Sequence, residues 1–157
     1  MFCSSLRFNL DPFDQFTDEE IWGVLDDVHM KQAVKDMPLQ LQAEITDDGD
    51  NLSVGQRQLV CFARALLRKP KVVVLDEATA AVDNATDAII QKMVKEKLKD
   101  CTLLTIAHRL HTIVDSDKIM VLDNGLLVEE DTPNNLISKW DGVFSGMWAQ
   151  HTASHNR

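Results

Sequence analysis

Three short segments of this sequence carry side chains that suit chemistry on phosphate groups. In the first, Ser53-Val54-Gly55-Gln56, a hydroxyl and a glycine stand at the first turn of a predicted helix. The free N–H groups and the positive dipole end of a helix attract anions, Ser53 can add a donor, and Gly55 lets an oxygen approach the backbone. A serine here is also an ordinary helix cap, so this segment alone leaves both interpretations open.

The second segment places two carboxylates directly after an apolar run. Val72 to Leu75 is typical of a strand buried on both faces of a parallel sheet, and Asp76 and Glu77 follow it. Ligands of open α/β sheets bind at the C-terminal ends of the strands. There Asp76 can hold Mg²⁺ through water, and Glu77 can polarise a water that attacks a γ-phosphate. Many strands end in acidic loops, so a solvated Asp-Glu turn is the alternative.

The third segment is a histidine after a second apolar run. Thr102 to Ala107 has the same strand pattern, which places His108 on the same sheet edge as Glu77. An imidazole offers both a donor and an acceptor near neutral pH, so His108 can bond a γ-phosphate, although a lone histidine after a strand is also commonly structural. The remaining histidines lack acidic or cysteine partners at metal-ligand spacing and are interpreted as structural: His29, His111, His151 and His155.

Helices must position these segments, and short capping and terminating patterns in the sequence indicate where those helices begin and end. Thr17 to Glu20 is a capping box, followed by apolar residues on one helical face. A second helix opens at Ser53 and stops before Lys69-Pro70. A third, Thr86 to Leu98, connects the two predicted strands as a βαβ crossover. The sequence therefore predicts an α/β fold with a parallel sheet.

The C-terminal third carries a hairpin signal and two further helix signals. Ile119 to Leu122 and Leu126 to Val128 flank an Asn124-Gly125 turn, which predicts a β-hairpin. Thr132-Pro133 starts a helix. The polar residues 151–157 are expected to fray. A final helix is indicated by the spacing of Trp140, Phe144, Met147 and Trp148.

Composition excludes several classes of protein. A net charge of -9 and a pI near 4.9 argue against a nucleic-acid binder, which grips phosphates with clustered Lys and Arg. The widely spaced Cys3, Cys61 and Cys101 indicate reduced thiols and a cytosolic setting. Apolar runs are far shorter than the roughly 20 residues that span a bilayer, so we expect no transmembrane segment and a membrane link only through a partner.

Taken together and in this order, the segments resemble the ATP-binding cassette (ABC) ATPases. Leu52 to Gln56 resembles the family's signature motif, and Val72 to Glu77 its Walker B strand with the catalytic glutamate. Ala81-Val82-Asp83 resembles its D-loop, and His108 its switch histidine. The similarity extends from about Leu6 to about Leu136.

Two longer stretches refine this resemblance. Asn9 to Phe13 and Asp76 to Asp83 are similar to the second ATPase domain of subfamily C, the multidrug-resistance-associated transporters. The resemblance implies a partial P-loop NTPase (ABC ATPase) fold over residues 1–150, with a helical signature part at about 15–70 and a parallel-sheet core part at 71–137. The Walker A motif has the pattern G-x-x-x-x-G-K-[ST], and none of the six glycines in this sequence is followed by Lys. We therefore expect the N-terminal Walker A portion to be missing.

In the family, ATP and Mg²⁺ lie between Walker A of one domain and the signature motif of the other. The resemblance therefore implies that Ser53, Val54, Gly55, Gln56 and Asp83 contact ATP held by a second nucleotide-binding domain. Asp76, Glu77 and His108 would instead need a Walker A in their own domain, so the chain alone is not expected to hydrolyse ATP. Implied partners are that second domain and the transmembrane domains of a parent transporter, at the cytoplasmic face of a membrane.

Two other functions stay open at this stage. The chain can be a non-catalytic module that docks on an intact ABC ATPase domain and lends or blocks the signature face. It can also belong to a soluble cassette protein, such as a translation factor, although the stretch from Asn9 to Phe13 favours transport.

Overall fold

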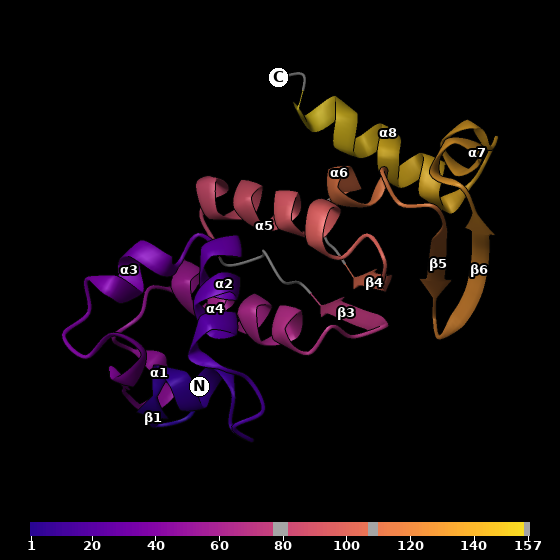
Figure 1. Ribbon diagram of the computed structural model, residues 1–157. Helices are drawn as coiled ribbons and strands as arrows, with labels where there is room; N and C mark the ends of the chain where they lie inside the picture. Colours follow the sequence, from indigo (N-terminus) through magenta and orange to yellow (C-terminus); the bar gives the residue numbers. More distant parts are fainter. Residues whose placement is uncertain (77–81, 107–109, 156–157) are drawn as a thin grey trace. The chain divides into compact units, whose positions relative to one another are not determined.

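The computed structural model describes residues 1–76, 82–106 and 110–155, which form two compact units, residues 1–104 and 105–157 (Figure 1). The first unit contains mostly helices, and the second contains a hairpin with three helices. This division differs from the motif-based one at residues 15–70 and 71–137, which stays a prediction.

The first unit is built around one long helix, α4 (Val54–Leu67). Helices α1 (Leu6–Leu10), α2 (Asp18–Asp27) and α5 (Asn84–Lys97) all contact α4. The remaining elements are β1 (Ser4–Ser5), α3 (Lys31–Lys35), β2 (Glu44–Ile45), β3 (Val72–Asp76) and the 3₁₀ turns Gln40–Gln42 and Asp47–Gly49. Strand β4 (Thr102–Ile106) begins in this unit and ends in the second.

The predicted capping box at the start of α2 is confirmed. The Glu20 N–H donates to Thr17 Oγ1 at 3.3 Å, and the Thr17 N–H donates to Glu20 Oε2 at 2.9 Å. Two orphan donors of the helix end are satisfied in this way. The apolar face of the helix then buries Ile21 and Leu25 completely.

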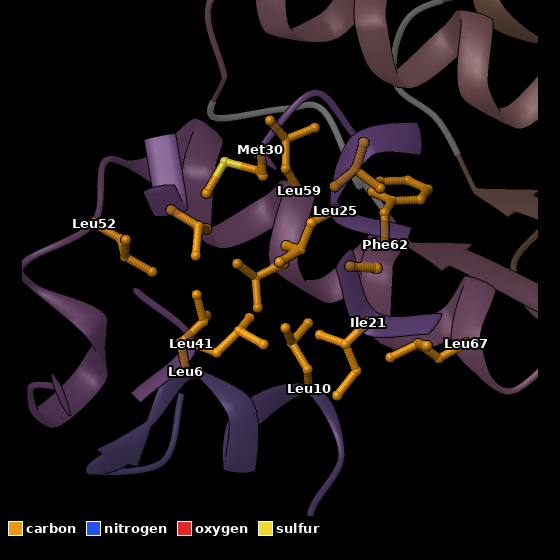
Figure 2. Close-up of a cluster of buried hydrophobic side chains, with 14 of the residues drawn as sticks. Leu6, Leu10, Ile21, Leu25, Met30, Leu41, Leu52, Leu59, Phe62 and Leu67 are labelled. Atoms are coloured by element: carbon orange, nitrogen blue, oxygen red, sulfur yellow. The ribbon is translucent and has the colours of Figure 1, made fainter. Parts of the chain in front are cut away.

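A single cluster of buried side chains joins α1, α2 and α4 (Figure 2). Figure 2 shows these side chains directed toward one another across the space between the helices. Burying a leucine or isoleucine side chain stabilises by about 1.5–3 kcal/mol, so this cluster fixes the position of α4 within the unit. Its labelled members are Leu6, Leu10, Ile21, Leu25, Met30, Leu41, Leu52, Leu59, Phe62 and Leu67.

A buried asparagine ties the N-terminal segment to α4. Asn9 is 1% exposed, and its Oδ1 accepts from the Phe2 N–H at 2.9 Å and from Arg64 Nη2 at 2.8 Å. Its Nδ2 donates to the carbonyls of Phe2 at 2.8 Å and Ser5 at 3.1 Å. The Arg64 guanidinium also lies 5.7 Å from the centre of the Phe2 ring. One side chain therefore holds both β1 and its flanking residues in place.

The two predicted strands of the crossover pair with each other in a parallel sheet, as expected, and α5 connects them. The expectation that β3 is buried on both faces is wrong. Val73 is buried, whereas Val72 and Val74 are 60% and 58% exposed. Side chains alternate along a strand, and among the described residues only one face of this two-stranded sheet is covered. The β4 side chains are likewise exposed or half-buried.

The second unit contains α6 (Leu110–Ile113), β5 (Ile119–Asp123), β6 (Leu126–Asp131), α7 (Pro133–Ser138) and α8 (Val143–His155). The predicted hairpin is confirmed, since β5 and β6 pair antiparallel with Asp123 opposite Leu126. Asn124 and Gly125 have φ of 48° and 78°, the left-handed pair that a tight hairpin turn of type I′ requires.

Glu129 is a buried acidic residue of the second unit. Its Oε1 accepts from Lys139 Nζ at 2.8 Å and its Oε2 accepts from the Phe144 N–H at 2.9 Å. The Lys139 hydrogen bond, followed by the one from Phe144, holds the pKa of Glu129 below its usual value. The carboxylate therefore links β6 to the start of α8, beside the buried ring of Phe144.

The C-terminal helix is longer than expected. Residues 151–155, predicted as part of a frayed tail, continue α8. The Thr152 hydroxyl donates to the Trp148 carbonyl at 3.1 Å, and the Trp148 and His151 rings stack at 5.7 Å, which supports the last turns. None of the helices in the described ranges is both long and apolar enough to cross a membrane.

Candidate functional site

The first candidate segment forms the N-terminus of α4, as predicted. Ser53 is the N-cap, and the Gln56 N–H donates to its Oγ at 3.1 Å. In return the Ser53 N–H donates to Gln56 Oε1 at 2.9 Å, which completes a second capping box. Ser53 and Val54 are exposed, so this end of the helix faces solvent in the structure.

Within the described part of the chain, four donors at this helix end have no hydrogen-bond acceptor after the capping box has formed. The N–H groups of Val54 and Gly55 lie in the first turn, where a helix offers no preceding carbonyl. The Ser53 hydroxyl accepts a hydrogen bond and keeps its own hydrogen, and the Gln56 amide has its Nε2 outside the box. Phosphate oxygens are acceptors that suit such a set at the positive end of a helix dipole. The residues present therefore fit the phosphates of ATP.

Gly55 has a packing role that the sequence did not indicate. It is buried, and a Cβ added to it would lie 2.9 Å from Thr86 Oγ1 and 3.1 Å from Thr86 Cγ2. The space that a side chain would need is thus occupied by α5 of the same unit. A sequence pattern cannot reveal this contact, because the two residues are far apart along the chain and meet only in the fold.

An acidic turn precedes the candidate segment and is partly neutralised by an arginine. Asp48 and Gly49 have φ of 55° and 74°, which turns the chain sharply before α4. Arg57 Nη1 donates to the Asp48 carbonyl at 3.0 Å and lies 3.5 Å from Asp50 Oδ1. Exposed ion pairs of this kind contribute at most about 1 kcal/mol, so the effect is mainly on the local charge beside Ser53.

Asp83 caps α5. Its Oδ1 accepts from the N–H groups of Ala85 and Thr86, both at 3.0 Å, and its Oδ2 accepts from Thr86 Oγ1 at 2.8 Å. The hydrogen bonds from Thr86 hold the pKa of Asp83 below its usual value. The helix therefore begins at Asn84, two residues before the predicted start, and the predicted contact of Asp83 with ATP stays a prediction.

Asp76 ends β3 and is exposed, as the predicted magnesium contact requires. The predictions for Glu77 and His108 lie outside the described residues. Within the described ranges, no three His, Cys, Asp or Glu side chains group closely enough to hold a metal ion. The contact of Asp76 with Mg²⁺ through water therefore stays a prediction.

Comparison with known proteins finds similarity to ATP-binding cassette proteins, in agreement with the resemblance of the motifs. The family model described as ABC transporter matches residues 5–80. ATP-binding cassette sub-family C member 2 of Rattus norvegicus is 56% identical over 88% of this chain, and sub-family C member 4 of Homo sapiens is 52% identical over 96%. The chain spans about a tenth of the length of these relatives, 9% and 11% respectively.

A solved structure has the same fold as this chain. It is described as a bacterial Atm1-family ABC exporter with ATP bound, and it superposes with a TM-score of 0.85 at 32% sequence identity. The match covers 96% of this chain and 26% of the exporter chain. The similarity thus extends over nearly all of the present sequence.

Proposed function

The chain belongs to the ABC transporter family, and from that premise we propose that it contributes the N-terminus of α4 to a nucleotide held by a second nucleotide-binding domain. The observation that carries this proposal is the start of α4, where Ser53 and Val54 are exposed and Gly55 is buried. The Val54 and Gly55 N–H groups, the Ser53 hydroxyl and Gln56 Nε2 remain as donors there. These donors suit the terminal phosphate of ATP, and they can act on a nucleotide that this chain does not itself hold.

Each residue of the segment has a separate task in this proposal. The Val54 and Gly55 N–H groups bond phosphate oxygens, and the capping box between Ser53 and Gln56 fixes the first turn of the helix that carries them. ATP supplies the negative charge that the positive helix end stabilises. Asp83 caps the first turn of α5 with three hydrogen bonds to its carboxylate oxygens, and its contact with the same ATP is part of this proposal.

Association with a second domain tests this proposal. The partner is an intact nucleotide-binding domain of human sub-family C member 4, with its own catalytic glutamate replaced so that ATP persists. We expect sedimentation to detect a complex in Mg-ATP that is absent in Mg-ADP. Ser53→Arg abolishes the complex, because it places a bulky cation at the helix end. The matched control is Thr17→Arg, which breaks the equivalent capping box of α2. Equal binding in ADP, or an equal loss with both substitutions, contradicts the proposal.

We further propose that the chain alone does not hydrolyse ATP. Asp76, Glu77 and His108 act on a nucleotide held by a phosphate loop of their own domain, and the sequence contains no G-x-x-x-x-G-K-[ST] motif. The purified chain is therefore expected to show no turnover above that of Glu77→Gln. Turnover that Glu77→Gln removes contradicts this part of the proposal.

The transport role of the whole protein is also a proposal. Relatives carry names of sub-family C transporters, which supports a parent whose transmembrane domains and second nucleotide-binding domain are partners of this chain at the cytoplasmic face of a membrane. In such a parent, ATP binding and hydrolysis with Mg²⁺ drive transport.

The exposed end of α4 also favours a second candidate function, that of a non-catalytic module that docks on an intact ABC ATPase domain. Steady-state ATP turnover of the intact domain, with and without this chain, separates the two candidates. A docking module changes that turnover, and Ser53→Arg removes the change while Thr17→Arg keeps it. Unchanged turnover at saturating chain concentration excludes the module.

A further inference from the structure

Two residues from distant parts of the chain meet at the starts of α4 and α5. Gly55 lies in the first turn of α4, and Thr86 lies in the first turn of α5. A Cβ on Gly55 would lie 2.9 Å from Thr86 Oγ1, 3.1 Å from Thr86 Cγ2 and 3.5 Å from Thr86 Cβ. Real Cβ atoms essentially never lie as close as 2.9 Å to another heavy atom, and 3.1 Å is tighter than nine in ten real Cβ contacts. A side chain at position 55 would therefore force one of the two helix starts to shift.

The rotamer of Thr86 is itself held by a third residue. Its Oγ1 donates to Asp83 Oδ2 at 2.8 Å, while its N–H donates to Asp83 Oδ1 at 3.0 Å. A threonine held at both its hydroxyl and its backbone has little freedom to turn away from Gly55. The contact is therefore built from three parts: a cap, a fixed side chain and a glycine.

From this arrangement we propose that Thr86 is a positioning residue. Held by Asp83, its side chain fills the space at Gly55 and fixes the first turn of α4 against the first turn of α5. We name the contact among Asp83, Thr86 and Gly55 the helix-start lock. Its consequence for nucleotide binding rests on the proposed function, because the N–H groups that the lock orients are those of Val54 and Gly55.

A melting-temperature cycle on the full chain tests the lock without any partner. Gly55→Ala alone forces a methyl group against Thr86, and we expect it to lower the melting temperature by roughly 5 °C. In a Thr86→Ala background only the Cβ remains, at an ordinary contact distance of 3.5 Å. There Gly55→Ala is expected to raise the melting temperature by about 2 °C, because alanine favours a helix over glycine.

Gly23 provides the matched control, since nothing lies within 4 Å of a Cβ built on it. Gly23→Ala should have the same effect in the unsubstituted chain and in the Thr86→Ala background. If Gly55→Ala changes the melting temperature equally in both backgrounds, Thr86 does not fill the space at Gly55 and the lock is overturned.

Milder substitutions separate positioning from simple space filling. Thr86→Val keeps the branched shape and loses the hydrogen bond to Asp83, whereas Thr86→Ser keeps the hydroxyl. We expect the Gly55 amide resonance in an NMR spectrum to move in Thr86→Val and to return toward its original position in Thr86→Ser. An unmoved Gly55 resonance in Thr86→Val, with a displaced one in Thr86→Ser, overturns the role of the hydroxyl.

The nucleotide consequence has its own measurement. With the intact partner domain in Mg-ATP, Thr86→Val is expected to weaken association about fivefold, a loss of about 1 kcal/mol, and Thr86→Ser to restore it. Affinity unchanged in Thr86→Val overturns the link between the lock and nucleotide binding. If the unsubstituted chain does not associate at all, the proposed function fails, while the melting cycle still decides the lock.

Discussion

Replacing Asn9 tests the interpretation of that residue as a structural hub. Asn9→Ala removes an amide whose oxygen accepts from Phe2 and Arg64 and whose nitrogen donates to the carbonyls of Phe2 and Ser5, at a site that is 1% exposed. Each buried group left without a partner costs about 1–3 kcal/mol. If water replaces about half of the lost bonds, the free energy of unfolding falls by about 3 kcal/mol, and the melting temperature by about 9 °C.

Urea unfolding followed by far-ultraviolet circular dichroism measures this change. Asn9→Asp separates the donor and acceptor roles, because a carboxylate oxygen still accepts from the Phe2 N–H and Arg64 Nη2 but the side chain can no longer donate to the carbonyls of Phe2 and Ser5. Asn134 is exposed on α7, so Asn134→Ala serves as the matched control and is expected to change stability by less than about 0.5 kcal/mol. An Asn9→Ala midpoint equal to that of Asn134→Ala refutes the hub.

Two further predictions concern the second unit and the turn glycine. Because hydrogen bonding with Lys139 lowers the pKa of Glu129, its contribution is full above the unfolded-state pKa of about 4.3 and is lost as pH falls through the lower folded value. Glu129→Gln should remove the fall in the urea unfolding midpoint that occurs as pH drops below about 4. A midpoint that depends on pH as it does in the unsubstituted chain contradicts this. Gly125→Ala should cost about 1–2 kcal/mol in thermal melts because φ is 78°, while Gly23→Ala, in a helix, should stabilise slightly; equal effects would disprove the backbone argument.

Local hydrogen-bond patterns made several elements predictable from the sequence. The capping box at Thr17, the helix start at Ser53 and the Asn124-Gly125 turn each involve residues within four positions of one another, and all three are confirmed. Helix α5 begins at Asn84, two residues before the start predicted from apolar spacing, because Asp83 caps it.

Burial and distant contacts could not be predicted in the same way. The apolar run at β3 indicated burial on both faces, but burial depends on how many layers cover the sheet, which a strand's own residues do not specify. The contact between Gly55 and Thr86 and the contact between Asn9 and Arg64 join segments that are far apart in sequence. Glycine at position 55 was explained by ligand approach, whereas the structure adds a steric need inside the unit.

The most direct test of the central claim is an NMR titration of the isotope-labelled chain with an intact nucleotide-binding domain. We predict that the amide resonances of Val54 and Gly55 shift downfield when the partner holds Mg-ATP, because their N–H groups then donate to phosphate. The same resonances should stay in place when the partner holds Mg-ADP. Resonances that do not move in Mg-ATP, or that move equally with both nucleotides, would contradict the account.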